Sequence, residues 1–288
     1  MTARWRLRHA TTYTYAHQVD MATHMLHLTP RELPGQKVLS SAIRSLPEAA
    51  RATTGIDHFG NGVTWLFIDS PHDRFEVIST AEVETGFASP PAANATASWE
   101  SVAAAAGGEV AEFLFDSPLI TLAAAARVFA STSFPRGRPV LEGLLHLMSR
   151  IRRDFAYRPG VTGISTSVEH VMTTKAGVCQ DFSHVMIAGL RGLGLPARYV
   201  SGYIRTRTPP GKVRMRGADQ SHAWVGAWMG PEHGWVDLDP TNDCVVSTEH
   251  VVLGWGRDFS DVSPLRGVIL GGGRHTLHVG VDLEPAES

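Results

Sequence analysis

Residues 175–196 read KAGVCQDFSHVMIAGLRGLGLP and predict a helix that begins at a cysteine. Apolar residues recur at helical spacing through this segment: Phe182, Val185, Met186, Gly189, Leu190 and Leu193. The Gly-Leu-Pro sequence at 194–196 stops the helix, because glycine favours a C-terminal cap and proline cannot continue the helix. Cys179 then lies in the first turn, where unpaired N–H groups and the helix dipole stabilise anions. We therefore expect its thiol to ionise readily.

A lone cysteine is more often a buried structural residue than a nucleophile, so its partners decide between the two. A nucleophile needs a base and a group that orients the base. Residues 222–228 and 235–239 predict two strands joined by a tight turn. His222 begins the first strand and Asp239 ends the second, so they lie opposite or diagonal, with Cβ atoms about 5 to 8 Å apart. Asp237 shares the face of Asp239 and is the alternative orienting acid.

Four segments carry a pattern that extends beyond the cysteine helix. They read GVCQDFSH at 177–184, LGLPARYVSGY at 193–203, SHAWV at 221–225 and GWVDLDPTN at 234–242. In this order they closely resemble the bacterial transglutaminase-like family, and the resemblance covers the chain from about Phe155 to Val281. It implies a papain-like α+β core in which a nucleophile helix packs on an antiparallel sheet. It also implies a triad of Cys179 as nucleophile, His222 as base and Asp239 as orienting acid.

The N-terminal part of the chain predicts a mostly antiparallel β domain. Apolar and polar residues alternate over 4–15 and over 75–84, the period of a half-buried strand. Gly60-Asn61-Gly62 precedes the apolar run 63–68, which indicates a hairpin. The segments 29–31 and 57–61 also resemble, more weakly, the accessory β domain of the same family.

Residues 86–98 lack periodicity and are rich in Ala, Ser, Pro, Thr and Asn, which is typical of a linker. We therefore expect an accessory β domain at 1–95 and a catalytic core at 96–288. Within the core, Ser117-Pro118 predicts the start of a helix and 141–155 predicts another. The alternating residues 275–283 predict a final strand.

Composition excludes several classes of protein. A chain of 288 residues is long enough for two domains of about 150 residues each, and 43% hydrophobic residues argue against disorder. A net charge of −2 is too balanced for a nucleic-acid partner. The sequence lacks an apolar run of membrane-spanning or signal-peptide length, so we expect no membrane partner. It does not set an oligomeric state.

The two cysteines, Cys179 and Cys244, are too few for a disulfide scaffold, so we expect a cytoplasmic protein with free thiols. Cys179, His184 and His222 do not converge as metal ligands, since residues five apart do not share a helix face. Cys244 lacks a nearby basic partner in the sequence and is interpreted as a bystander. We expect neither a metal nor a cofactor.

The predicted chemistry is acyl transfer on an amide or peptide bond through a thioester on Cys179, with a protein or peptide as substrate. Water as the acceptor gives a cysteine peptidase or amidase, and an amine gives a transglutaminase. Hydrolysis is favoured weakly, because water needs no acceptor site. The alternative is a binding or scaffold module that keeps the fold without turnover.

Overall fold

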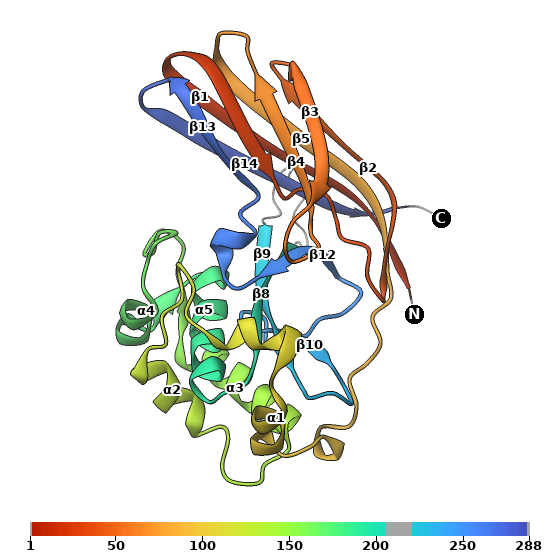
Figure 1. The fold of residues 1–288 in the computed structure, drawn as a ribbon, viewed down its shortest axis with the longest axis vertical. Coiled ribbons are helices and arrows are strands. Elements are labelled where there is room, and N and C mark those ends of the chain that lie inside the picture. The colour runs from red at the N-terminus through yellow and green to blue at the C-terminus, as the bar shows by residue number, and fades with distance from the viewer. Residues whose placement is uncertain (1, 206–220, 287–288) are drawn as a thin grey trace, which may run out of the picture.

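The computed structural model of the protein describes residues 2–205 and 221–286. Figure 1 shows a layer of strands above a second part, in which helices pack against a smaller sheet. The described strands form a seven-stranded sheet, a five-stranded sheet and a two-stranded ribbon, of which the two larger sheets are antiparallel. This mixed arrangement confirms the predicted α+β fold class.

The seven-stranded sheet is organised around one long strand. Its members are β1 (Ala3–Leu26), β2 (Gln36–Leu46), β3 (Arg51–Ile56), β4 (Gly62–Ile68), β5 (His72–Thr85), β13 (Leu265–Gly271) and β14 (His275–Pro285). The first part of β1 pairs with β5 and β14, and the second part pairs with β4 and β13. The alternation predicted for residues 4–15 is confirmed, since Trp5 and Leu7 are buried. The arginines that alternate with them, Arg4, Arg6 and Arg8, are exposed.

The last two strands return to the beginning of the chain. β14 pairs with β1 from Trp5 to Tyr15, and β13 pairs with β1 from Val19 to Leu26. The sequence predicts the strand at 275–283 but does not reveal its partner, because pairing over such a separation leaves no local signal. The division of the chain at residue 95 stays a prediction, and residues 265–285 lie in the first sheet.

The second part of the molecule contains the remaining elements. Its five-stranded sheet has the order β11-β10-β9-β8-β12, with β8 (Ala197–Ile204), β9 (Ser221–Trp228), β10 (Trp235–Asp239), β11 (Cys244–Val245) and β12 (His250–Gly256). The short strands β6 (Ala156–Tyr157) and β7 (Ala176–Gly177) pair in parallel. The helices are α1 (Trp99–Ala105), α2 (Ala124–Ser131), α3 (Val140–Asp154), α4 (Val168–Thr174) and α5 (Cys179–Gly192), with 3-10 turns η1 (Ala93–Ala95), η2 (Gly108–Leu114) and η3 (Phe259–Asp261).

Helix α5 lies at the centre of this part. All its residues from Asp181 to Arg191 are buried, because α2, α3 and α4 cover one side of the helix and the five-stranded sheet covers the other. The sheet contributes mostly small and branched residues, and one tyrosine, to the shared core: Ala197, Tyr199, Ala223, Val225, Ala227, Val236 and Leu238. The predicted helix and its start at Cys179 are confirmed.

One predicted helix start is wrong. Ser117-Pro118 does not begin a helix, and α2 begins at Ala124. Ser117 instead pairs with Ile120 in a tight turn, and the N–H of Leu119 donates to Asp258, 139 residues later in the chain. A tertiary hydrogen bond thus overrides the local capping signal.

The two parts of the molecule are joined at β12, an edge strand of the five-stranded sheet. The side-chain amide of Gln36 donates to the carbonyl of Val252 and accepts from its N–H, at 2.8 and 2.7 Å. The amide of Asn61 makes the same two bonds with the backbone of Trp255, at 2.8 and 2.9 Å. These two amides bind backbone groups at the edge of the sheet, where the Val252 carbonyl also accepts the N–H of Arg31 at 3.2 Å.

Among residues 2–205 and 221–286, no helix has both the length and the apolar character needed to cross a bilayer.

The close contact between α5 and α2 yields a stability prediction. A Cβ atom at Gly189 would lie 2.8 Å from the Cβ of Ala130 and 3.1 Å from the carbonyl oxygen of Ala126. We expect Gly189→Ala to lower the free energy of unfolding by about 1 to 3 kcal/mol, measured by urea denaturation, although alanine favours a helix. Gly107→Ala is the control, because a Cβ there meets nothing within 4 Å. An unchanged or more stable Gly189→Ala variant would contradict the close packing.

Candidate active site

The nucleophile candidate begins helix α5. Cys179 is the first helical residue, and the side chain of Asp181 accepts the N–H of Val178 just before it, at 2.7 Å. Thr162 donates to the same carboxylate oxygen at 2.7 Å. Gly177 leaves room for this carboxylate, since a Cβ there would lie 2.6 Å from it. The cap fixes the helix start, and the N–H groups of the first turn remain without partners inside the helix.

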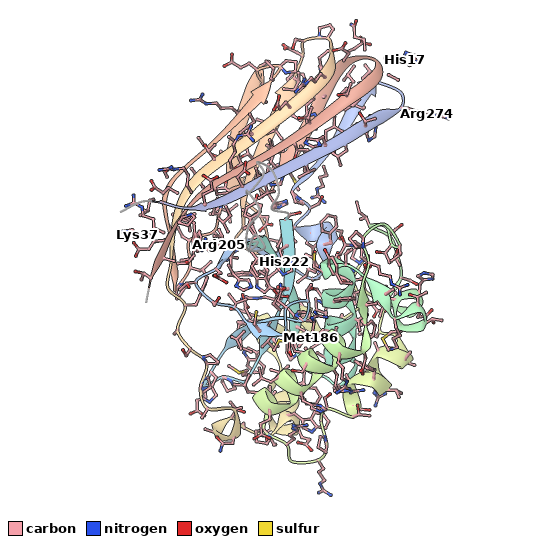
Figure 2. All side chains as sticks on the ribbon, turned by 180° about the vertical axis from the view of Figure 1, so that it is seen from behind. His17, Lys37, Met186, Arg205, His222 and Arg274 are labelled. Carbon is pink, nitrogen blue, oxygen red and sulfur yellow. The ribbon has the colours of Figure 1, made fainter. Side chains whose placement is uncertain are left out.

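The base candidate comes from the second residue of β9. His222 is 8% exposed, and Figure 2 places it at the end of β9 that faces the seven-stranded sheet. Its Nε2 lies 2.7 Å from Oδ2 of Asp239. Cys179, at the start of α5, is close enough to contribute to the raised pKa of this imidazole.

Asp239 is fully buried, and donors surround both of its oxygens. Oδ1 accepts the N–H groups of Thr241 and Asn242 at 2.9 and 3.1 Å. Oδ2 accepts the side-chain amide of Asn242 at 2.7 Å, in addition to His222. Sequence reasoning missed Asn242, although its place three residues after Asp239 is typical of a turn in which an aspartate accepts backbone N–H groups.

The strand register explains why Asp239 and not Asp237 meets the imidazole. Leu238 pairs with Val225, which leaves His222 diagonal to Asp239, as one of the two predicted placements requires. Asp237 instead accepts the indole N–H of Trp224 at 3.2 Å and lies 3.7 Å from the guanidinium of Arg198.

The electrostatics of the pair follow from its hydrogen bonds. Burial lowers the pKa of His222, but the hydrogen bonds to Asp239 and Cys179 and the charges of both residues outweigh it and raise this pKa to about 10. Burial raises the pKa of Asp239, but the hydrogen bonds from His222, His250 and Asn242 bring it well below its ordinary value. At neutral pH the pair is an imidazolium and a carboxylate, so His222 carries a proton that it can donate.

Two tyrosines lie near the thiol. Burial, and then the charge of Cys179, raises the pKa of both Tyr157 and Tyr199. Tyr199 is in the core beneath α5, whereas Tyr157 is exposed and pairs with Gly177 just before the nucleophile. Tyr157 therefore lies at the surface near Cys179.

Three tryptophans lie in the β9–β10 hairpin, close to the His–Asp pair. Trp224 is fully buried, and its ring centroid lies 6.0 Å from that of His222, so it covers the imidazole. Trp228 lies in the core shared with α5, and Trp235 stacks on Arg198.

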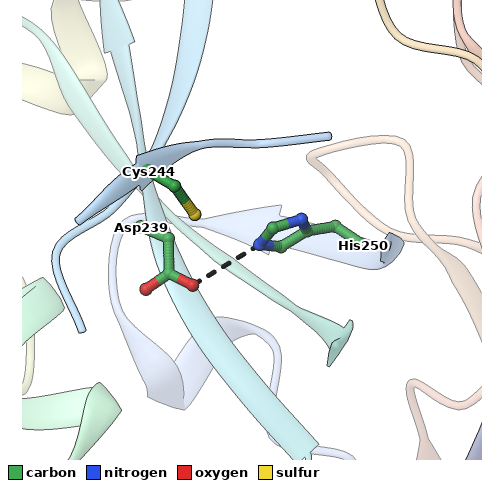
Figure 3. Close-up of side chains that lie close together, drawn as sticks. All are labelled: Asp239, Cys244 and His250. Carbon is green, nitrogen blue, oxygen red and sulfur yellow. Dashed lines mark hydrogen bonds and ion pairs between the residues drawn. The ribbon is translucent and has the colours of Figure 1, made fainter. Parts of the chain in front are cut away.

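A second cluster shares Asp239 with the site. One ligand atom each of Asp239, Cys244 and His250 lie within 4.8 Å of one another (Figure 3). His250 Nε2 lies 3.4 Å from Oδ2 of Asp239. Sequence reasoning missed this histidine and treated Cys244 as a bystander without a basic partner, whereas β11 and β12 bring both residues beside Asp239.

Comparison with known proteins agrees with this geometry. Residues 5–84 match the bacterial transglutaminase-like N-terminal region, and residues 130–240 match the transglutaminase-like superfamily core. The second match contains the predicted site residues Cys179, His222 and Asp239. Their catalytic roles stay a prediction.

Relatives and solved structures extend the likeness over the chain. An uncharacterised protein of Mycobacterium tuberculosis is 39% identical over 99% of this chain and 94% of its own, and one of Mycobacterium leprae is 33% identical over 97% and 98%. A protein-glutamine gamma-glutamyltransferase of Pseudomonas aeruginosa is 35% identical over 33% of this chain and 15% of its own. The fold is similar to the crystal structure of a candidate cysteine protease from Cytophaga hutchinsonii, with a TM-score of 0.79, 21% identity, and coverage of 100% of this chain and 92% of that one.

The order of the sequence blocks, the nucleophile helix on an antiparallel sheet and these matches lead to one conclusion. The chain belongs to the bacterial transglutaminase-like family.

Proposed function

We propose that the protein catalyses thiol-dependent acyl transfer on amide or peptide bonds, with Cys179, His222 and Asp239 as its catalytic triad. The observation that supports the proposal is the 2.7 Å contact between the His222 imidazole and the buried Asp239 carboxylate, together with the effect of Cys179 on the pKa of that imidazole. Such a chain of nucleophile, base and orienting group is what a covalent mechanism requires.

The proposed reaction has two stages. The Cys179 thiolate attacks the carbonyl carbon of the substrate, and the proton of the His222 imidazolium passes to the leaving amine as the C–N bond breaks. His222 then takes a proton from the incoming water or amine, which attacks the thioester, and the C–S bond breaks to regenerate the Cys179 thiolate and the His222 imidazolium. The backbone N–H of Cys179 is a candidate donor to the oxyanion, because it lies at a helix start.

The acceptor of the acyl group separates hydrolysis from transfer. We favour hydrolysis, because water needs no site of its own, and the structural likeness to a candidate cysteine protease is consistent with that choice at the level of fold. Similarity to a protein-glutamine gamma-glutamyltransferase over 33% of the chain supports amine transfer as the second candidate. We assign the reaction to the cytoplasm, which agrees with two unpaired cysteines.

Thiol reactivity tests the triad. With iodoacetamide at mildly acidic pH, we expect Cys179 to react faster than Cys244, because His222 stabilises the Cys179 thiolate while burial and nearby carboxylates raise the pKa of Cys244 to about 11. Peptide-resolved mass spectrometry measures both rates. Equal, slow labelling of the two cysteines would instead support a scaffold module.

Variants of the two candidate acids form a matched pair in this assay. We expect His222→Ala to abolish the enhanced rate and Asp239→Asn to lower it by about 10- to 100-fold, because a charge-assisted hydrogen bond is lost. Asp237→Asn should retain most of the rate, since that carboxylate faces Arg198 and Trp224. A severe Asp237→Asn and a mild Asp239→Asn would reverse the assignment.

The His222–Asp239 pair also predicts how stability depends on pH. The raised pKa of His222 stabilises the fold fully below its ordinary value of 6.5, and this contribution is lost as pH rises through about 10. The lowered pKa of Asp239 stabilises the fold above its ordinary value of 3.8, and this contribution is lost as pH falls below it. The deficit of Asp239→Asn in free energy of unfolding should therefore be largest between about pH 4 and 6.5 and shrink toward pH 10.

Denaturant titrations across this range measure the deficit. Glu76→Gln is the control, because it removes an exposed ion pair with Arg74 and should cost little at any pH. A deficit of Asp239→Asn that stays constant from acid to alkaline pH would show that the pair does not titrate as described.

Product analysis distinguishes the two acceptors. A peptide library is incubated with the protein, with and without a labelled primary amine, and products are identified by mass. We expect hydrolysed peptides that disappear in the Cys179→Ala variant. Incorporation of the amine without hydrolysis would assign the protein to amine transfer, and no product of either kind would leave only the scaffold alternative.

A further inference from the structure

We propose that His250 is a positioning residue that holds the Asp239 carboxylate in the orientation His222 needs. The proposal rests on the triad proposed above and adds a second imidazole to it. His250 is the first residue of β12, is 1% exposed, and places Nε2 3.4 Å from Oδ2 of Asp239 (Figure 3).

The tautomer of His250 follows from its other ring nitrogen. The backbone N–H of Ser247 donates to Nδ1 at 3.2 Å, so Nδ1 is the acceptor of the ring. In a neutral imidazole the other nitrogen then carries the hydrogen. Nε2 of His250 is therefore a donor aimed at the Asp239 carboxylate.

The position of this donor sets the direction of the carboxylate. Oδ2 of Asp239 faces His222, Asn242 and His250, while Oδ1 faces two backbone N–H groups. With Asp239 fully buried, water does not replace a missing donor easily, so each one restricts rotation of the carboxylate. His250 contributes a donor from β12, in addition to the one that His222 contributes from β9, and it connects the end of β10 to β12.

The same strand connects His250 to the N-terminal sheet. Val252 lies two residues after His250, and the Gln36 amide binds its N–H and carbonyl. His250 itself pairs with Ile204 of β8. The placement of His250 thus depends on β8 on one side and on a residue of the first sheet on the other.

A metal ion bound by Asp239, Cys244 and His250 would be a different use of the cluster, and the donor pattern argues against it. A metal needs the lone pair of Nε2, but the lone pair of Nδ1 already accepts the Ser247 N–H, so the ring would have to lose its remaining proton.

The ionisable side chains near Asp239 come from several elements. His222 faces it from β9, Cys244 from β11 and His250 from β12, and Cys179 lies beyond His222 at the start of α5. Asn242 is uncharged. A change in how the rate of Cys179 modification depends on pH therefore reports on these groups.

The test compares His250→Phe with His250→Gln by the rate at which iodoacetamide modifies Cys179 as a function of pH. Phenylalanine keeps the ring volume without a donor, and we expect a rate about tenfold lower at mildly acidic pH, since one hydrogen bond to a charged group is lost. Glutamine supplies an amide N–H, and we expect it to restore most of the rate. Circular dichroism and thermal unfolding verify that both variants fold.

The outcomes separate this proposal from the triad itself. If Cys179 of the unaltered protein is no more reactive than Cys244, the proposed function fails before His250 is considered. If the triad is reactive but both variants match the unaltered protein, or both are equally slow, His250 does not position the carboxylate. Stoichiometric zinc binding to a Cys179→Ala protein that His250→Phe abolishes would overturn the tautomer argument and identify a metal site.

Discussion

A carboxylate with no exposure to solvent must find its hydrogen bonds inside the protein, and Asp239 is the residue around which the site is arranged. Its five donors are the N–H groups of Thr241 and Asn242, the amide of Asn242 and the imidazoles of His222 and His250. They come from β9, β12 and the turn after β10. Removing one of these donors changes the electrostatic environment of the carboxylate and of the other four donors.

This constraint links the chemistry to the architecture. His222 stays protonated although it is buried, because Asp239 remains ionised. Asp239 remains ionised because strands fix the positions of its hydrogen-bond donors. Cys179 is fixed separately, by the cap that Asp181 provides at the start of α5. The five-stranded sheet and α5 share one core, so the two halves of the site are held at a constant separation by packing.

Local patterns predicted the elements that carry Cys179, His222 and Asp239, because helical periodicity and the hairpin signal depend on neighbouring residues. They also narrowed the orienting acid to two aspartates of one face. His250 and the pairing of β14 with β1 could not be predicted, since each depends on strands that meet only in the folded chain. The helix expected at Ser117 failed for the same reason, because Asp258 competes for its backbone from far along the sequence.

The pairing of β13 and β14 with β1 has a consequence for synthesis on the ribosome. β1 is synthesised long before its partners β13 and β14, so one of its edges is completed only by residues 265–285, after the whole helical part has been made. Until then a 24-residue strand presents open N–H and C=O groups, which is a hazard for aggregation. The helical part must therefore fold before the sheet closes, or a chaperone must shield the open edge of β1 until then.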